Sequence, residues 1–164
     1  MTNCTLNRKV KKRALHINFD GGDVSGIGGV ELLRAADDRM GLCTAASKLL
    51  PDQRDSRYTT HQWDALFRQR IYAIAAGFAD VNDHQQLRLD AALQSAVGVM
   101  EPLGSAATLC RVEAVPGALS EQAARKTVFQ MHQLILQQFI DSHDKPPKSL
   151  ILDFDGTDDR VHGQ

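Results

Sequence analysis

The clearest structural pattern in the chain is the stretch HQWDALFRQRIYAIAAGF, residues 61–78. Its large apolar residues follow one another at steps of four, four, three and four positions: Trp63, Phe67, Ile71, Ile74 and Phe78. Because an α-helix turns once every 3.6 residues, this spacing places them in one stripe along a helix. The pattern therefore predicts a helix over residues 61–78 and indicates a mainly helical protein.

Two arginines of this helix differ in their position relative to the stripe. On a helical wheel, Arg70 falls inside the apolar stripe, between Trp63 and Ile74, whereas Arg68 falls outside it. A buried guanidinium is unfavourable without an anionic partner, so Arg70 either forms an internal ion pair or lies in a groove that receives an anion. We expect the internal ion pair.

Similar patterns predict further helices on both sides of this one. Apolar spacing and helix-breaking residues place helices over residues 30–40, 42–50, 90–97, 105–113 and 120–142. Asp90 and Ser105 are residue types that cap helix N-termini, and Ser120 opens the longest predicted helix. Ahead of the helices, alternating apolar and polar residues from Ala14 to Asp20 predict a half-buried strand.

The predicted helices over residues 90–97 and 105–113 flank a turn that contains Pro102 and Gly104. This pair resembles a helix-turn-helix unit, whose second helix reads DNA and here offers Thr108 and Arg111. Most short helix pairs in proteins touch no DNA, so the pair by itself favours an ordinary packing motif.

Composition excludes several classes of protein. With 164 residues, of which 43% are hydrophobic and 24% charged, the chain reads as a soluble globular protein of one domain, or one domain and a fragment of another. Its apolar runs are too short to cross a membrane, and its N-terminus lacks the apolar stretch of a signal peptide, so we expect a cytoplasmic protein. Cys4, Cys43 and Cys110 lie far apart and match neither a disulfide framework nor a zinc site.

The net charge of −1 hides a basic head. Five of the 19 basic residues lie within residues 8–13: Arg8, Lys9, Lys11, Lys12 and Arg13. The rest of the chain contains the other 14 basic residues and all 20 acidic residues, so it is acidic overall. Such a cluster favours phosphate backbones through counterion release, although it also occurs in solvated tails. On charge alone, we favour the solvated tail.

The candidate chemistry lies near the C-terminus, in the run SLILDFDGTDD, residues 149–159. This run is apolar on both faces until its first aspartate, which is typical of a strand buried on both sides. In a strand over residues 149–155, Asp153 and Asp155 share one face at the carboxyl end. Carboxylates there suit magnesium or manganese, and their spacing of about 7 Å favours one carboxylate per metal. The alternative is an acidic strand end closed by an Asp-Gly turn.

Asp153, Asp155, Gly156 and Thr157 resemble the phosphoaspartate motif of the haloacid dehalogenase phosphatases. That resemblance implies that Asp153 is the nucleophile and Asp155 the acid/base. In those phosphatases the motif normally opens the fold and the sheet follows it, whereas here it stands close to residue 164. The phosphatase is therefore the lesser alternative.

A second resemblance covers nearly the whole chain. Seven segments, in this order, resemble the N-terminal part of a bacterial insertion-sequence transposase of the DDE type: Asn18-Phe-Asp-Gly-Gly-Asp, Gly29-Val-Glu-Leu-Leu-Arg, Leu50-Pro-Asp-Gln-Arg-Asp, Phe67-Arg-Gln-Arg-Ile, Val81-Asn-Asp-His, Thr108-Leu-Cys-Arg-Val-Glu and Leu152-Asp-Phe-Asp-Gly-Thr-Asp-Asp. The resemblance implies an RNase H-like domain in which two aspartates and a glutamate hold two divalent metal ions, magnesium or manganese. Asp155 fits the place of the first aspartate best, with Asp153 as the second choice.

The resemblance also implies a partner for the rest of the chain. The family's N-terminal region is largely helical and helps to bind the inverted-repeat ends of the element, which implies double-stranded DNA as the partner and the nucleoid as the location, with a homodimer left open. The implied DNA contacts are Arg8, Lys9, Lys11, Lys12, Arg13, Arg54, Arg57, Arg68, Arg70, Thr108 and Arg111.

The predicted fold class is mainly α with a small β component. Residues 1–145 are expected to form the mostly helical DNA-binding region, and residues 146–164 the start of a truncated RNase H-like domain. Its strand over 149–155 would pair with the strand over 14–20, since no other strand is evident. Because the resemblance leaves the second aspartate, the glutamate and most of the sheet missing, we expect a fragment that holds no metal tightly and catalyses no transposition alone. A non-catalytic DNA-binding module is the alternative function.

Overall fold

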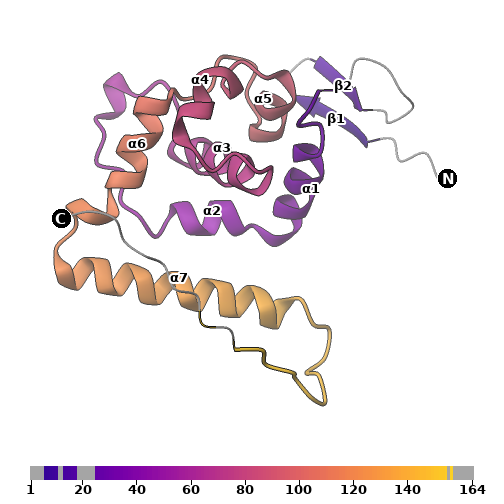
Figure 1. Ribbon diagram of the computed structural model, residues 1–164, viewed down its shortest axis with the longest axis vertical. Helices are drawn as coiled ribbons and strands as arrows, with labels where there is room; N and C mark the ends of the chain where they lie inside the picture. The colour runs from indigo at the N-terminus through magenta and orange to yellow at the C-terminus, as the bar shows by residue number, and fades with distance from the viewer. Residues whose placement is uncertain (1–5, 11–12, 18–24, 155, 157–164) are drawn as a thin grey trace.

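Helices account for most of the chain in this computed structural model, which describes residues 6–10, 13–17, 25–154 and 156, with only the backbone described for residues 6–10 and 13–16. Figure 1 shows α3 amid the other short helices and α7 along one side. The elements in chain order are β1 (Leu6–Val10), β2 (Arg13–Ile17), α1 (Val30–Met40), α2 (Leu42–Ser47), η1 (Ser56–Tyr58), α3 (Trp63–Ala75), η2 (Val81–Asp83), α4 (His84–Leu87), α5 (Ala91–Val97), α6 (Ala106–Ala114), η3 (Pro116–Ala118) and α7 (Glu121–Asp141).

Helix starts follow the capping residues. The side chains of Asp90, Ser105 and Ser120 accept hydrogen bonds from the backbone N–H three residues later, and α5, α6 and α7 begin directly after them. These bonds satisfy N–H groups that have no partner inside the helix. The end of α1 at Gly41 follows from a φ of 66°, a left-handed conformation that suits glycine. The predicted helices over residues 30–40, 90–97, 105–113 and 120–142 are confirmed to within a residue or two, whereas those over residues 42–50 and 61–78 are confirmed as α2 and α3 but end three residues earlier than predicted.

The core forms around α3, which packs against α1, α2, α5 and α6. Its buried residues are Leu66, Gln69, Tyr72 and Ala73. The predicted stripe of larger apolar residues is instead half-buried, or exposed in the case of Ile74. The neighbouring helices cover the face that carries Leu66, Gln69, Tyr72 and Ala73. The stripe residues other than Ile74 pack against the two core clusters while staying partly exposed.

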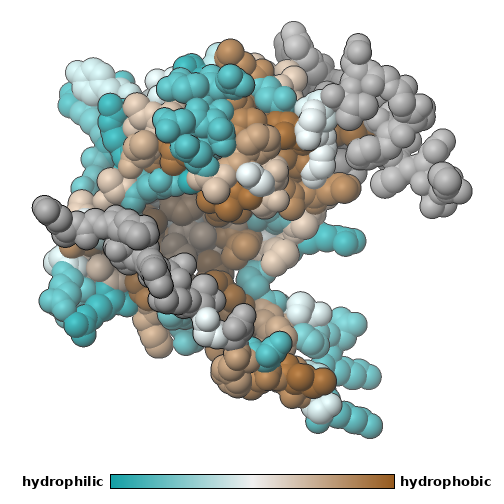
Figure 2. Space-filling model, viewed as in Figure 1, coloured by the Kyte–Doolittle hydropathy of each residue, from teal (hydrophilic) through white to brown (hydrophobic). Residues whose placement is uncertain are grey.

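The predicted apolar stripe of α7 is not buried either. None of the described side chains of this helix is fully buried, and Ile135 is 63% exposed. The only substantial helix contact of α7 among the described residues is with α2. Figure 2 shows hydrophobic surface in the lower part of the molecule, where α7 and the segment that follows it lie, and the exposed apolar residues come from both. A helical pattern predicts which residues share a face, but not that another element covers that face.

The strand predictions are confirmed in part. β2 overlaps the predicted strand over residues 14–20 at residues 14–17, and residues 18–20 lie outside the described residues. Its partner is β1, antiparallel, with Leu6 opposite Ile17 and Val10 opposite Arg13. The prediction that residues 14–20 pair with a strand over residues 149–155 is therefore wrong.

A strand over residues 149–155 is not confirmed. Residues 149–154 have no regular secondary structure, and Ile151 is 98% exposed. A strand needs a neighbour for its backbone N–H and C=O groups, and a strand apolar on both faces needs layers on both sides. The described residues supply neither at this position.

Candidate nucleic-acid interface

The loop between α2 and α3 carries two arginines that each bind an aspartate two positions earlier. Arg54 donates to Asp52 through Nε at 2.7 Å and Nη2 at 2.8 Å, and Arg57 donates to Asp55 through Nη2 at 2.7 Å. These hydrogen bonds are the largest cause that lowers the pKa of each aspartate. The repeated Asp-x-Arg arrangement fixes the course of the loop.

The two arginines differ in what else they contact. Arg54 donates through Nη1 to the backbone oxygen of His61 at 3.0 Å, and its guanidinium carbon lies 5.1 Å from the centre of the Trp63 ring. Arg57 is 78% exposed and lies 5.7 Å from the ring of Tyr58, which is exposed as well. Arg54 therefore holds the loop against α3, whereas Arg57 and Tyr58 form its accessible tip.

Arg68 and Arg70 of α3 are both engaged inside the protein. Arg70 pairs with Glu113 through Nε and donates through Nη2 to the backbone oxygen of Ala79 at 2.7 Å. The predicted internal partner of Arg70 is therefore confirmed. Arg68 lies 3.1 Å from a carboxylate oxygen of Asp64 and 3.9 Å from one of Asp37. A role of these two arginines in DNA contact stays a prediction.

The α5–turn–α6 unit presents one predicted cation to solvent. Ala106, Leu109 and Val112 are the buried side of α6, which contacts α3 and η2. Arg111 is exposed and has no ion pair or side-chain hydrogen bond in the part of the chain that the structure describes. Thr108 is half-buried, with its hydroxyl 3.1 Å from that of Ser105.

The basic head lies at the β1–β2 hairpin. In its backbone register, Arg8 is opposite Leu15, Lys9 is opposite Ala14 and Arg13 is opposite Val10. Three of the five cations therefore belong to one short hairpin. Lys11 and Lys12 lie outside the described residues.

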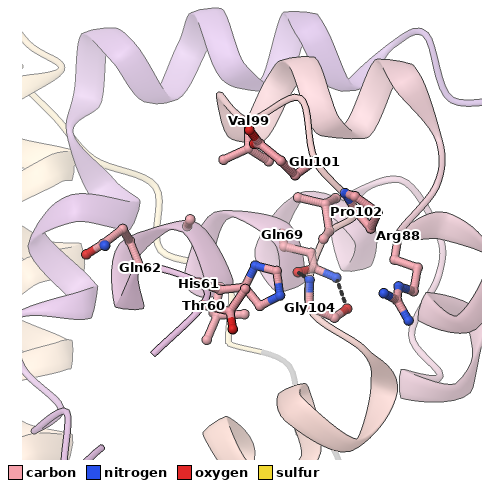
Figure 3. A pocket seen from close by; sticks show the side chains of 12 residues that line it. Thr60, His61, Gln62, Gln69, Arg88, Val99, Glu101, Pro102 and Gly104 are labelled. Carbon is pink, nitrogen blue, oxygen red and sulfur yellow. Dashed lines mark hydrogen bonds between the residues drawn. The ribbon is translucent and has the colours of Figure 1, made fainter. Parts of the chain in front are cut away.

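A cavity of about 380 Å³ contains two residues that the sequence did not single out, His61 and Arg88. Figure 3 shows them with Gln69 and Gly104 at the wall of the cavity. Burial and then the charges of Arg88 and Arg54 lower the pKa of His61. No periodicity or motif marks Arg88 in the polar stretch that precedes Asp90, so its position could only come from the fold.

Gln69 joins this cavity to a buried histidine. Its amide donates to the backbone oxygen of Gly104 at 2.8 Å and accepts from the Gly104 N–H at 3.0 Å. The same amide nitrogen lies 3.0 Å from Nδ1 of His84, which is fully buried. Burial and then the charge of Arg70 lower the pKa of His84.

The free energy of unfolding should fall as the pH drops below about 6.5. Because the pKa of His84 is lower in the folded chain, the unfolded chain binds the proton more readily, and the stability present above pH 6.5 is lost at lower pH. His84 adds at most about 1.4 kcal/mol per pH unit, and His61 contributes with the same sign but less, because it is partly exposed to solvent. Urea unfolding at pH 7.5 and pH 5.0 measures this difference. It should shrink in His84→Gln and persist in His143→Gln; an unchanged difference in His84→Gln would contradict the prediction.

The chain matches the model of one known protein family. The profile of the family described as transposase DDE domain group 1 matches residues 7–164. The chain belongs to this transposase family. Searches of curated proteins and of solved structures found no match. No helix in the described part of this transposase-family chain has the length and apolarity to cross a membrane.

Transposases of the DDE type use divalent metal ions, so the carboxylates must be tested against such a site. Asp153 is exposed on irregular chain, and Asp155 lies outside the described residues. Among residues 6–10, 13–17, 25–154 and 156, no three His, Cys, Asp or Glu side chains gather as metal ligands. The described residues of this transposase-family chain thus do not fit a two-metal centre. The exposed Asp153 gives the phosphatase interpretation no support either.

Proposed function

We propose that this chain is a DNA-end-binding part of its transposase family. It binds the double-stranded inverted-repeat ends of an insertion sequence, which would place it on the nucleoid, and its 164 residues do not cut or join DNA by themselves. The observation that carries the proposal is the family match over residues 7–164. The basic head and the exposed arginines support it, because phosphate backbones attract such cations.

Arg57 and Arg111 are the best-placed of the proposed DNA contacts. Arg111 has no competing ion pair in the described residues, and the partner of Arg57, Asp55, is itself exposed. An ion pair at the solvent-exposed surface contributes little to stability, so a DNA phosphate can replace Asp55 with little loss. The exposed ring of Tyr58 next to Arg57 offers a face on which a base can stack.

The carboxylates of these 164 residues are the reason to propose binding without cutting. The family resemblance calls for two aspartates and a glutamate around two metals. The last glutamate of the sequence is Glu121 on α7, ahead of Asp153 and Asp155. Among the described residues no group of carboxylates gathers as metal ligands, so a full two-metal site would need further carboxylates.

A homodimer stays a prediction. Its contact surface would be the exposed apolar face of α7, where residues 128–140 contain no Asp, Glu, Lys or Arg. In a symmetric dimer each residue meets the same surface on the other copy, so a face without charges avoids repulsion between like charges.

The purified chain should bind duplex DNA that carries the terminal inverted repeats of its element more tightly than a shuffled duplex of the same composition. Fluorescence anisotropy at several salt concentrations measures this preference, and affinity should fall as salt rises. Arg57→Gln and Arg111→Gln should each weaken binding and reduce the slope of log K against log salt by about one. The same DNA should stay intact with Mg²⁺ or Mn²⁺.

Arg125→Gln is the matched control, because Arg125 is an exposed arginine that is paired with Glu121 on α7 and lies outside the proposed contacts. It should leave the salt slope unchanged. Equal affinity for the two duplexes at every salt concentration would contradict DNA-end binding, and metal-dependent cleavage would contradict the non-catalytic part of the proposal.

A further inference from the structure

The cavity at His61 and Arg88 lies between the start of α3 and the turn that leads into α6. Its volume of about 380 Å³ falls in the range of small-ligand sites. Apolar walls come from Ala65, Leu66, Val99, Pro102 and Leu103. Polar groups at the cavity include Thr60, His61 and Arg88, whereas Gln62 points away from them in Figure 3.

The backbone of Arg88 is fixed while its side chain is left without a partner. Its carbonyl oxygen accepts from the Leu103 N–H at 2.9 Å and from the Gln94 amide at 3.0 Å. Its Nε is buried and has no hydrogen-bond partner, and among the described residues its guanidinium has no ion pair. A buried donor of this kind is unfavourable unless an acceptor reaches it.

Comparison with the other arginines makes Arg88 stand out. Each of the other partly buried arginines with a described side chain has a carboxylate within 4.0 Å: Arg34, Arg54, Arg68 and Arg70. Glu101 also lines the cavity, and its carboxylate accepts from the Met100 N–H at 3.2 Å. The acceptor for Arg88 is therefore expected from outside the described residues.

We propose that this cavity binds a phosphate group on the Arg88 guanidinium, with the Thr60 hydroxyl and the His61 ring N–H as further donors. A guanidinium binds phosphate through two parallel hydrogen bonds, and the remaining phosphate oxygens can accept from the other two groups. The charge of Arg88, which acts on His61 and has no ion pair among the described residues, favours an anion in the cavity. The phosphate comes either from a DNA backbone or from free phosphate, and the inference does not require DNA-end binding.

The test is an NMR titration of the ¹⁵N-labelled full chain with inorganic phosphate at constant ionic strength, set by chloride. The Arg88 Nε–H, the His61 ring and the Gly104 amide should shift together and saturate, and the pKa of His61 should rise, because the phosphate charge favours the imidazolium. Arg88→Gln should weaken phosphate binding at least about tenfold, because it removes the charged donor. Since the Arg88 side chain has no partner in the described residues, this variant should keep the amide spectrum of the folded chain.

Arg39→Gln is the control, because it removes the same charge from an exposed position on α1. It should leave the phosphate affinity unchanged. A second titration with a short duplex separates the two sources: saturable shifts with inorganic phosphate indicate free phosphate, and Arg88-dependent shifts with DNA alone indicate the backbone. Shifts that do not saturate with either probe, or that persist in Arg88→Gln, would overturn the proposal. If Arg88→Gln does not fold, two other measurements test the proposal. Thr60→Val should weaken phosphate binding, and phosphate should raise the pKa of His61 in the unaltered chain; neither effect would be seen if the cavity binds no phosphate.

Discussion

Replacing Asp37 with alanine should lower the free energy of unfolding by about 3–5 kcal/mol. Asp37 of α1 is 9% exposed, and its carboxylate accepts from the Tyr72 hydroxyl at 2.8 Å and from the Cys43 backbone N–H at 2.9 Å. It also lies 3.9 Å from Nε of Arg68. Alanine would leave these donors without their acceptor in the space between α1, α2 and α3. Urea unfolding followed by circular dichroism measures the loss.

The neighbouring Asp38 provides a matched control. Its side chain is 55% exposed and pairs with Arg34 one helical turn earlier at 2.6 Å. Such a pair contributes less than about 1 kcal/mol, so Asp38→Ala should have a small effect. Asp37→Asn should fall between the two, because an amide oxygen can still accept a hydrogen bond. Similar losses for Asp37→Ala and Asp38→Ala would show that the buried carboxylate has no special role.

The thiol of Cys43 gives an independent measurement of the same contact. Burial, followed by the charge of Asp37, raises the pKa of Cys43 to about 12. Burial and a hydrogen bond to Asp37 also raise the pKa of Tyr72. Burial and Asp37 together thus keep both neighbours protonated, and Cys43 is a packing residue with little reactivity. In a folded Asp37→Ala chain, the pKa of Cys43 should move down.

Local rules predicted most of the helical part of the fold. Asp90, Ser105 and Ser120 begin helices because their side-chain oxygens accept backbone N–H groups, and that preference is a property of a few consecutive residues. The partner of Arg70 followed from a similar argument, since a guanidinium on an apolar face needs an anion. The identity of that anion, Glu113, could not be read from spacing because it lies 43 positions away.

Features that depend on distant packing were missed. To predict the β1–β2 hairpin, a second strand would have to be recognised in a stretch dominated by basic residues. The cavity at Arg88 depends on how α3, α4 and the turn before α6 pack together. The sequence predicted which residues of α7 share an apolar face, but not that this face is exposed. Periodicity does not show whether another element covers a face. The apolar run before Asp153 predicted a strand, yet strand formation requires neighbours that the run itself cannot provide.

Gly104→Ala should lower the free energy of unfolding by about 1–3 kcal/mol, because it overpacks a closed site. A Cβ on Gly104 would lie 2.6 Å from Cδ2 of Leu66 and 3.1 Å from Oε1 of Gln69. Leu66 is 1% exposed and has little room to move, and Gln69 is held by both backbone groups of Gly104. The strain would therefore reach the turn before α6. Thermal and urea unfolding measure the loss.

A double-mutant cycle separates this steric cause from a general effect of losing glycine. Gly117→Ala is the simple control, since a Cβ there meets no heavy atom within 4 Å, and it should change stability by less than about 0.5 kcal/mol. Leu66→Ala opens space opposite Gly104 at its own cost of about 2–5 kcal/mol. If the clash is the cause, Gly104→Ala should be less destabilising in the Leu66→Ala background than in the unaltered chain, because the two changes share one contact. Additive losses would show that the Leu66 contact is not responsible, and that the chain before α6 needs glycine for another reason.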